Sequence, residues 1–184
     1  MERYRFLLSG SGGQGIITMA ILLAETASIQ EGLMSVQSQS YGPEARGGAT
    51  RSDVIISDTP ILFPKVTQPN ILVALTNEAT AKYLPLIRPG GLLLYDSELV
   101  QPNERIDAQM IGLPMYRITK EKLGRTVAFN ICVLGALVSL TEIVGLPSVR
   151  KTLEKNFAPA HHEANKAALG LGVDLAKASF WNRY

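Results

Sequence analysis

A cluster of glycines near the amino end of the chain is the first feature that could do chemistry. The pattern G-x-G-x-x-G is satisfied by Gly10-Ser11-Gly12-Gly13-Gln14-Gly15, and dinucleotide-binding proteins place this pattern between a strand and a helix. Glycines let the backbone turn tightly and approach a ligand closely. The free N–H groups at the start of the following helix favour a phosphate or a carboxylate. The pattern predicts an anion-binding loop, with a tight turn that binds nothing as the alternative.

Two familiar ligands of such a loop are not supported by the residues around it. A site for NAD(P) or a flavin normally has an acidic residue about 20 positions further on, at the end of the second strand. This chain has Gln37-Ser38-Gln39-Ser40 there. A P-loop expects Lys and then Ser or Thr directly after its last glycine, where this chain has Ile16 and Ile17. ATP hydrolysis is therefore disfavoured, and a stand-alone NAD(P)-binding oxidoreductase domain remains an alternative that lacks its ribose-binding acid.

A second glycine-rich segment, SYGPEARGGATR at residues 40–51, has no hydrophobic periodicity. It is either a functional loop or a turn-rich connection, and the sequence alone does not decide between them. Its Arg46 and Arg51 could clamp an anion, or they could pair with the nearby Glu44 and Asp53.

The thiol and the imidazoles favour structural roles. Cys132 has only apolar neighbours, which favours a core thiol over a nucleophile. His161 and His162 are adjacent, so on a helix they point about 100° apart and do not easily share one metal ion. We therefore expect no catalytic residue and no metal site in this chain.

Composition favours one soluble domain spanning residues 1–184. A hydrophobic fraction of 46% suits a full core, and 18 basic against 16 acidic residues give little support to nucleic-acid or membrane binding. The charged fraction of 18% is below the usual ~25%, which predicts that a partner covers part of the surface. A single cysteine excludes a disulfide within the chain and a four-thiolate iron–sulfur cluster. With no signal-peptide pattern and no membrane-spanning stretch, we expect a cytoplasmic protein.

Strands and helices alternate along the first hundred residues, and helices fill the last third. The expected strands are 4–9, 33–39, 53–57, 70–75 and 92–95, with a weaker one near 110–117. The expected helices are 16–29, 79–87 behind an Asn77 N-cap, 127–144, 148–156 and 161–178. The first strand–helix–strand unit predicts that its two strands are parallel neighbours. The whole pattern predicts an α/β fold with a Rossmann-like open, mostly parallel sheet and helices on both faces.

The two glycine-rich segments together are far more specific than either alone. Ser9-Gly10-Ser11-Gly12-Gly13-Gln14-Gly15 followed by Tyr41-Gly42-Pro43-Glu44-Ala45-Arg46-Gly47-Gly48 resembles the gamma subunit, or gamma domain, of the 2-oxoacid:ferredoxin oxidoreductases. The resemblance continues through 52–57, 69–75, 130–136 and 163–170, and so covers nearly the whole chain. One departure is Asn70, where many members of the family carry Asp.

This resemblance implies a reaction and a set of partner subunits. Enzymes of this family oxidatively decarboxylate a 2-oxoacid to an acyl-CoA and pass the electrons singly to ferredoxin. Thiamine diphosphate with its magnesium ion, and the iron–sulfur clusters, would be held by alpha, beta and delta partner subunits. The gamma part is Rossmann-like, packs on the thiamine-binding core and contributes to coenzyme A binding. A short, separate gamma chain favours the 2-oxoglutarate type, with pyruvate, branched-chain and aryl-pyruvate types as alternatives.

The resemblance also implies a coenzyme A site made by both glycine-rich segments. The backbone of residues 10–15 would bind the pyrophosphate, with Ser11 and Gln14 as side-chain donors, and the second wall would be Tyr41, Arg46, Gly47 and Gly48. Asn130 and Asn165 could orient these loops, or each could make an ordinary structural hydrogen bond. A purely structural subunit remains the other alternative. The helix expected at 127–144 is apolar nearly all round, which predicts association with the alpha and beta subunits and self-association without them.

Overall fold

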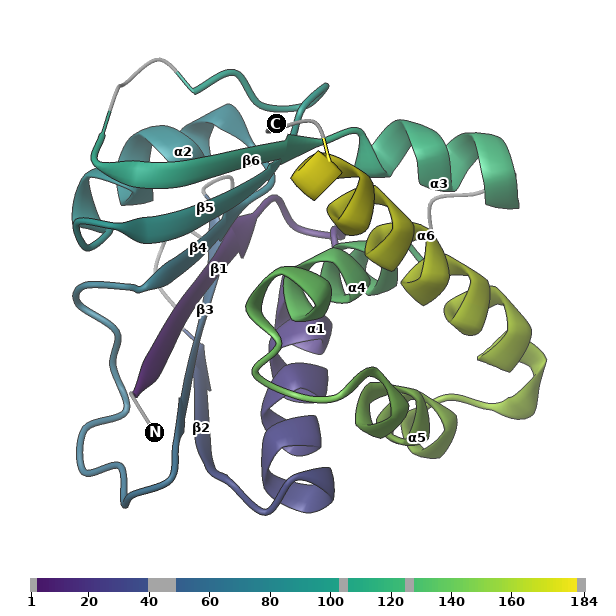
Figure 1. Ribbon diagram of the computed structural model, residues 1–184, viewed down its shortest axis with the longest axis horizontal. Helices are drawn as coiled ribbons and strands as arrows, with labels where there is room; N and C mark the ends of the chain where they lie inside the picture. Colours follow the sequence, from purple (N-terminus) through teal and green to yellow (C-terminus); the bar gives the residue numbers. More distant parts are fainter. Residues whose placement is uncertain (1–2, 40–48, 103–105, 125–127, 182–184) are drawn as a thin grey trace.

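The computed structural model describes residues 3–39, 49–102, 106–124 and 128–181, and it shows a six-stranded sheet with helices on both faces (Figure 1). The strands are β1 (Tyr4–Gly10), β2 (Met34–Gln39), β3 (Thr50–Ser57), β4 (Ile71–Ala74), β5 (Gly91–Asp96) and β6 (Ala108–Leu113). The helices are α1 (Ile16–Glu25), α2 (Asn77–Tyr83), α3 (Met115–Leu123), α4 (Phe129–Thr141), α5 (Leu146–Asn156) and α6 (His162–Trp181). Shorter helical turns are η1 (Thr26–Gln30), η3 (Leu84–Leu86) and η4 (Pro159–His161).

The strand order is β2-β3-β1-β4-β5-β6, and the sheet is mostly parallel as expected. Strands β1, β4, β5 and β6 pair in parallel, whereas β3 is antiparallel to both of its neighbours. The expectation that strands 4–9 and 33–39 are neighbours is wrong, because β3 lies between them. They do run in the same direction, since each is antiparallel to β3. The crossover rule concerns consecutive parallel strands, and here the next strand returns antiparallel and takes the place beside β1.

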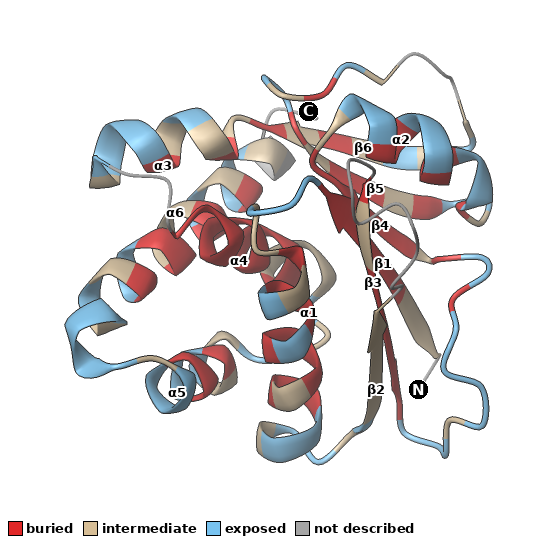
Figure 2. Ribbon diagram, turned by 180° about the vertical axis from the view of Figure 1, so that it is seen from behind, coloured by how far each residue is buried: buried red, intermediate tan, exposed pale blue. Residues whose placement is uncertain are grey.

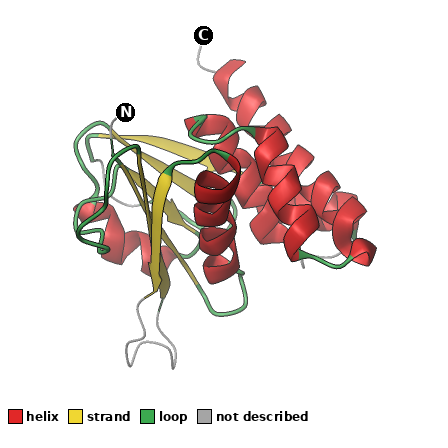
Figure 3. Ribbon diagram, turned by 90° about the horizontal axis from the view of Figure 1, so that it is seen from below, coloured by secondary structure: helices red, strands yellow, loops and turns green. Residues whose placement is uncertain are grey.

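Alternate residues of the central strands are buried on opposite faces of the sheet. In β1, Phe6 and Leu8 join the core formed with α1, α4 and α6, whereas Leu7 joins the smaller core under α2. Figure 2 shows the resulting band of buried residues through the sheet and into α4, and Figure 3 shows α2 on the other side of the sheet from the remaining helices. Burial on both faces explains why these strands are continuous apolar runs rather than alternating ones.

Helix α4 is the centre of the larger helical layer. Its residues Phe129–Val138 are all buried, because α1, α3, α5 and α6 pack around it. The helix predicted at 127–144 to be apolar on nearly all sides is therefore covered by other helices of the same chain. Helix α6 crosses α4 at two glycines: a Cβ on Gly172 would overlap the carbonyl oxygen of Cys132, and one on Gly135 would overlap that of Leu169.

Two boundaries differ from the sequence-based expectation. The strand expected near 110–117 ends at Leu113, and α3 begins at Met115. The carboxylate of Asp96 accepts a hydrogen bond from the backbone N–H of Tyr116 at 2.6 Å, which satisfies one free donor of the α3 start. The N-cap of α2 is Thr76, whose hydroxyl accepts from the N–H of Ala79, rather than Asn77. Within the described ranges, no helix combines the length and the apolar character needed to cross a membrane.

Candidate functional site

The glycine loop joins the end of β1 to the start of α1, at the carboxyl edge of the parallel strands (Figure 1). Its residues Ser11–Gly13 are exposed. Gly13 and Gly15 have φ angles of 87° and 74°, in the left-handed region that favours glycine. A Cβ built on Gly12 or Gly13 meets no atom within 4 Å. The loop therefore presents bare backbone to the space in front of it at these two positions.

Gln14 holds the loop in shape. Its Oε1 accepts a hydrogen bond from the Ser11 N–H at 2.7 Å, and its Nε2 donates to the carbonyl of Leu75 at 3.3 Å. Both polar atoms of this carboxamide, and the N–H of Ser11, are thus engaged within the protein. A Cβ on Gly10 would overlap Gln14 Oε1, so the glycine at this position makes room for the Gln14 side chain.

The start of α1 is free of side-chain caps. Gly15 is the N-cap residue, and the first turn contains no acidic residue. The uncapped N–H groups and the helix dipole leave a partial positive charge at this end. Because the loop and the helix start are continuous, the arrangement suits a phosphate or carboxylate group.

Asn130 fastens the loop from the helical layer. Its Nδ2 donates to the carbonyl of Gly15 at 3.4 Å, and it is 8% exposed. A Cβ on Gly15 would lie 2.6 Å from this nitrogen, so Gly15 is required both for its φ angle and for the close approach of α4. This contact is the structural hydrogen bond expected as one alternative for Asn130.

A cavity of about 500 Å³ lies beside the loop, between the starts of α1 and α4 and the beginning of α6. It is lined by Gly13, Gln14, Gly15, Thr18, Tyr116, Phe129, Asn130, Ile131, Phe157, His161 and Asn165. Asn165, the second asparagine singled out in the sequence, is buried in its wall. Sequence reasoning missed Tyr116, Phe129, Phe157 and His161, which come from separate parts of the helical layer and share no local pattern.

The second predicted wall, Tyr41, Arg46, Gly47 and Gly48, lies outside the described residues. Of the two strands that flank the segment, β3 starts beside the glycine loop. Thr50, the first residue of β3, is paired with Gly10, the last residue of β1. The second glycine-rich segment is therefore attached to the sheet at the same edge as the loop.

Arg51 pairs with Asp53, as one of the two alternatives expected. Its Nε and Nη2 donate to the two carboxylate oxygens at 2.8 and 2.9 Å, and Asp53 also accepts from the N–H of Val66 at 3.0 Å. The guanidinium lies over the ring of Tyr83, 5.3 Å from its centroid. Burial lowers the pKa of Arg51, but its hydrogen bonds and charge interaction with Asp53 more than offset this, so the pKa is raised overall. Arg51 is thus committed to a structural ion pair.

The sulfur and imidazole groups show no catalytic arrangement. Burial raises the pKa of the Cys132 thiol to about 11, as expected for a core cysteine rather than a nucleophile. His162 Nε2 lies 2.8 Å from the carbonyl of Phe157. Across the described part of the chain, no three His, Cys, Asp or Glu side chains are grouped closely enough to hold a metal ion.

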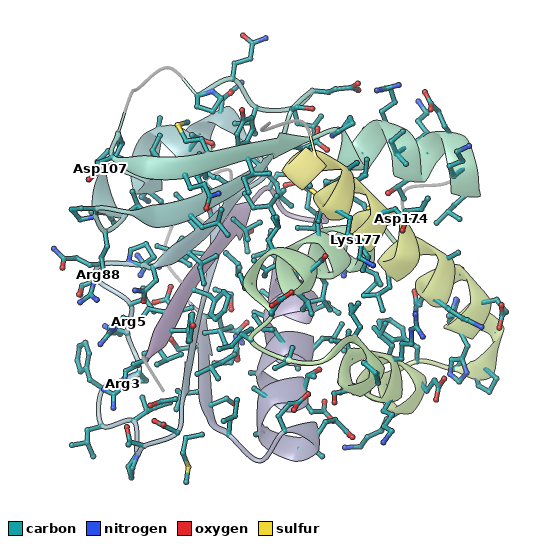
Figure 4. The ribbon with its side chains drawn as sticks, in the orientation of Figure 1. Arg3, Arg5, Arg88, Asp107, Asp174 and Lys177 are labelled. Atoms are coloured by element: carbon teal, nitrogen blue, oxygen red, sulfur yellow. The ribbon has the colours of Figure 1, made fainter. Side chains whose placement is uncertain are left out.

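Arginines at the sheet edge lie away from this site. Figure 4 labels Arg3, Arg5, Arg88 and Asp107, which are spread along the edge of the sheet where β1, β5 and β6 begin. The glycine loop follows the opposite, carboxyl end of β1. The positive character described at the site therefore comes from backbone N–H groups and helix ends rather than from these side chains.

Comparison with known proteins agrees with this architecture. Residues 5–175 match the family described as pyruvate ferredoxin/flavodoxin oxidoreductase. The chain is 42% identical over 177 residues to the 2-oxoglutarate synthase subunit KorC of Methanocaldococcus jannaschii, covering 95% of each chain. It is 41% identical to the gamma subunit of a keto/oxoacid ferredoxin oxidoreductase from Geobacter sulfurreducens, whose crystal structure superposes with a TM-score of 0.86 over 95% of this chain and 99% of that one.

A third structure shares the fold at lower identity. It is a 2-oxoglutarate:ferredoxin oxidoreductase from Magnetococcus marinus, solved with 2-oxoglutarate, coenzyme A and succinyl-CoA bound, with a TM-score of 0.86 and 23% identity. The match covers 97% of this chain and 32% of that longer chain. The family match and the two relatives above 40% identity show that the chain belongs to the pyruvate ferredoxin/flavodoxin oxidoreductase family, as a gamma subunit of a multi-subunit 2-oxoacid:ferredoxin oxidoreductase.

Proposed function

We propose that this chain is the gamma subunit of a 2-oxoglutarate-type complex and that it supplies part of the coenzyme A site. The names of the KorC relatives support the substrate. The main support for coenzyme A is the glycine loop itself, where bare backbone at Gly12 and Gly13 meets the uncapped start of α1. Coenzyme A carries a pyrophosphate, and this arrangement suits such a group.

The residues of this chain bind and orient rather than react. The N–H groups of the loop and of the first turn of α1 would hold the pyrophosphate, and the Ser11 hydroxyl is a side-chain donor beside them. Gln14 and Asn130 keep the loop in its open shape through hydrogen bonds to Leu75 and Gly15. Tyr41, Arg46, Gly47 and Gly48 would form the second wall of the site, as the resemblance implies.

The remaining chemistry belongs to partner subunits in this proposal. Alpha, beta and delta subunits would hold thiamine diphosphate, magnesium and the iron–sulfur clusters, and would pass electrons to ferredoxin. Residues 1–184 would act as one gamma-type domain, and a cytoplasmic location stays a prediction. The isolated chain, with or without added thiamine diphosphate, should therefore not reduce a viologen dye with a 2-oxoacid and coenzyme A. Turnover by the pure chain would contradict this division of labour.

The coenzyme A site is tested by substitution at Gly12 in the assembled complex. A Cβ there enters open space, so Gly12→Asp should fold, block the approach of the phosphate and repel its charge. Its KM for coenzyme A should rise far more than its KM for 2-oxoglutarate. Gly12→Asn is the matched control, because it has the same size without the charge and should raise the KM for coenzyme A less.

Arg46→Ala gives a second, milder test of the same site. Loss of a charge-assisted hydrogen bond costs about 1.5–3 kcal/mol, roughly ten- to hundred-fold in affinity for coenzyme A. Size-exclusion chromatography should first show that each variant complex is intact. If coenzyme A kinetics are unchanged in intact Gly12→Asp and Arg46→Ala complexes, the loops are structural and the purely structural alternative is correct.

A further inference from the structure

The sheet ends on one side in a strand that carries none of the usual protections of an edge. Among the described residues, β2 pairs with β3 only, and it is the last strand on its side (Figure 1). Natural proteins protect such edges with a charge, a proline or a bulge, because the outward N–H and C=O groups can pair with another strand. The sequence of β2, MSVQSQ, has no charge and no proline, and its pairing with β3 runs without a bulge from Met34 to Gln39. The edge is therefore suited to accept a further strand.

Exposed apolar side chains gather at this end of the sheet. Six large hydrophobic residues are exposed in the described part of the chain, and four of them belong to β2 or to segments beside it. These four are Ile29, Met34, Leu62 and Phe63, between 50% and 93% exposed. None of the six lies in β6, the strand at the other end of the sheet. Exposed apolar surface thus marks the β2 edge rather than sheet edges in general.

Two hydrogen bonds show which face of the sheet each β2 side chain is on. Ser35 Oγ donates to a carbonyl oxygen of α1 at 2.7 Å, whereas Ser38 Oγ donates to the carbonyl oxygen of Pro64 at 2.9 Å. Because side chains alternate along a strand, Met34 and Val36 share with Ser38 the face turned away from α1. The exposed Met34 therefore stands at one end of this row, and the segment containing Pro64 lies at the other end.

A second copy of β2 fits this row of side chains. In an antiparallel pair related by a two-fold axis through Val36, Met34 of each copy would lie opposite Ser38 of the other copy. It would then approach the Pro64 segment of that copy, which includes the exposed Leu62 and Phe63. The exposed apolar side chains of the two copies would thus cover one another.

The same contact would bury no charge. Residues 32–39 and 59–64 contain no Asp, Glu, Lys or Arg, and burying an unpaired charge is costly. A second copy brings the same uncharged surface to the contact. Two-fold contacts of this kind, in which both copies use the same patch, are the commonest in soluble homo-oligomers.

We propose that two copies of this chain pair through their β2 edges, antiparallel and with the two-fold axis at Val36, so that their sheets become continuous. The apolar residues of α4 are buried within the chain, so this edge, rather than that helix, would carry the self-association expected from the sequence. The inference goes beyond the proposed function and does not depend on coenzyme A.

Disulfide trapping in the full-length chain tests the register. Directly opposite residues of antiparallel strands have Cα atoms about 4.5–5.5 Å apart, which a disulfide can bridge. Val36→Cys should therefore give a covalent dimer under mild oxidation, and the native Cys132 is buried and should not compete. Gln109→Cys, at an exposed position of β6, is the matched control and should stay unlinked. No link through Val36→Cys, or equal linking of the control, would overturn the pairing.

Sedimentation or light scattering of the full-length chain tests the surface without a cross-link. The unsubstituted chain should form a dimer of twice its 19.9 kDa mass. Met34→Lys places a charge in the contact and should raise the dimer dissociation constant roughly ten-fold or more. Gln109→Lys adds the same charge at the other end of the sheet and should leave it unchanged, and circular dichroism should show both variants folded. A chain that stays monomeric, or a dimer that tolerates Met34→Lys, would overturn the proposal.

A strand from another subunit is the competing occupant of the edge. If the chain alone is monomeric and Met34→Lys instead prevents its assembly with alpha and beta subunits, one of those subunits covers the edge and the second copy is wrong. None of these measurements involves coenzyme A, so failure of this inference is distinguishable from failure of the proposed function.

Discussion

The crossing of α4 and α6 makes a sharp prediction about two glycines of one helix. In Gly172→Ala, the added methyl would overlap the carbonyl oxygen of Cys132 and lie 2.7 Å from the backbone nitrogen of Ala136. Both contacts are with helix backbone, which no side-chain rotation relieves. In Gly170→Ala, on the same helix, the methyl meets no atom within 4 Å. The same chemical change should therefore have opposite effects at the two positions.

The expected magnitudes follow from the contacts. Overpacking of a core commonly costs about 1–3 kcal/mol and occasionally more. At Gly172 the methyl must push two backbones apart along a helix whose residues Phe129–Val138 are all buried, so we expect the upper end, about 3 kcal/mol net of helix propensity. At Gly170 only the propensity gain remains, about 0.5–1 kcal/mol in favour of Ala.

Thermal or urea unfolding of the chain measures both effects. For a protein of this size a change of 1 kcal/mol shifts Tm by roughly 2–4 °C. Gly172→Ala should thus lower Tm by about 6–12 °C, and Gly170→Ala should raise it by a few degrees. The reasoning is refuted if Gly172→Ala is as stable as the unsubstituted chain, or if both variants lose stability equally, because helix crossing would then not depend on the glycine contact.

Three further predictions concern charges and the thiol. Asp53→Ala leaves the guanidinium of Arg51 without its carboxylate and should cost about 3–5 kcal/mol of unfolding free energy, with a smaller loss when Arg51 is replaced by Met as well. Cys132 should resist iodoacetamide at about pH 8 in the folded chain and react in denaturant, because burial raises its pKa to about 11; fast labelling of the folded chain would contradict this. The Lys155 hydrogen bond lowers the pKa of Glu25 below its ordinary value of 4.5. The ionised carboxylate therefore stabilises the folded chain above that pH, and this stabilisation is lost as the pH falls through the lowered folded-state pKa. Unfolding curves of the chain and of Glu25→Gln should accordingly converge under acid, and a constant difference down to pH 3 would count against the assignment.

Elements set by local patterns were predictable from the sequence. The apolar runs of β1, β4 and β5 depend on neighbours in the chain, and the structure confirms these strands. Helix α3 was missed because one of its starting N–H groups bonds to Asp96, twenty residues earlier. The place of β2 was wrong because strand neighbours are decided by tertiary pairing, here by the insertion of β3.

The site likewise has features that could be predicted from local sequence and features that depend on tertiary packing. The glycine loop was predictable because spacing, strand and helix are contiguous. The choice between two roles for Arg51 could have been narrowed, since Arg51 and Asp53 are two apart on a strand and share one face. The cavity could not be predicted, because Tyr116 and Phe157 approach the loop only after α3 and α5 have packed against the layer. Asn130 and Asn165 were singled out by resemblance. Only the structure shows that Asn130 Nδ2 donates to Gly15, whereas Asn165 Nδ2 has no partner among the described residues.

The late position of α4 and α6 in the chain has a consequence for biosynthesis. When β5 has left the ribosome, β1 already has its partners β3 and β4, but its Phe6 and Leu8 face a layer that is still only α1. The helices that complete this layer end at Trp181, so the face stays open until the chain up to that residue has left the ribosome. Nascent chains with exposed apolar sheets are prone to aggregate and depend on chaperones. Premature termination after β5 would therefore release an aggregation-prone fragment rather than a smaller working domain.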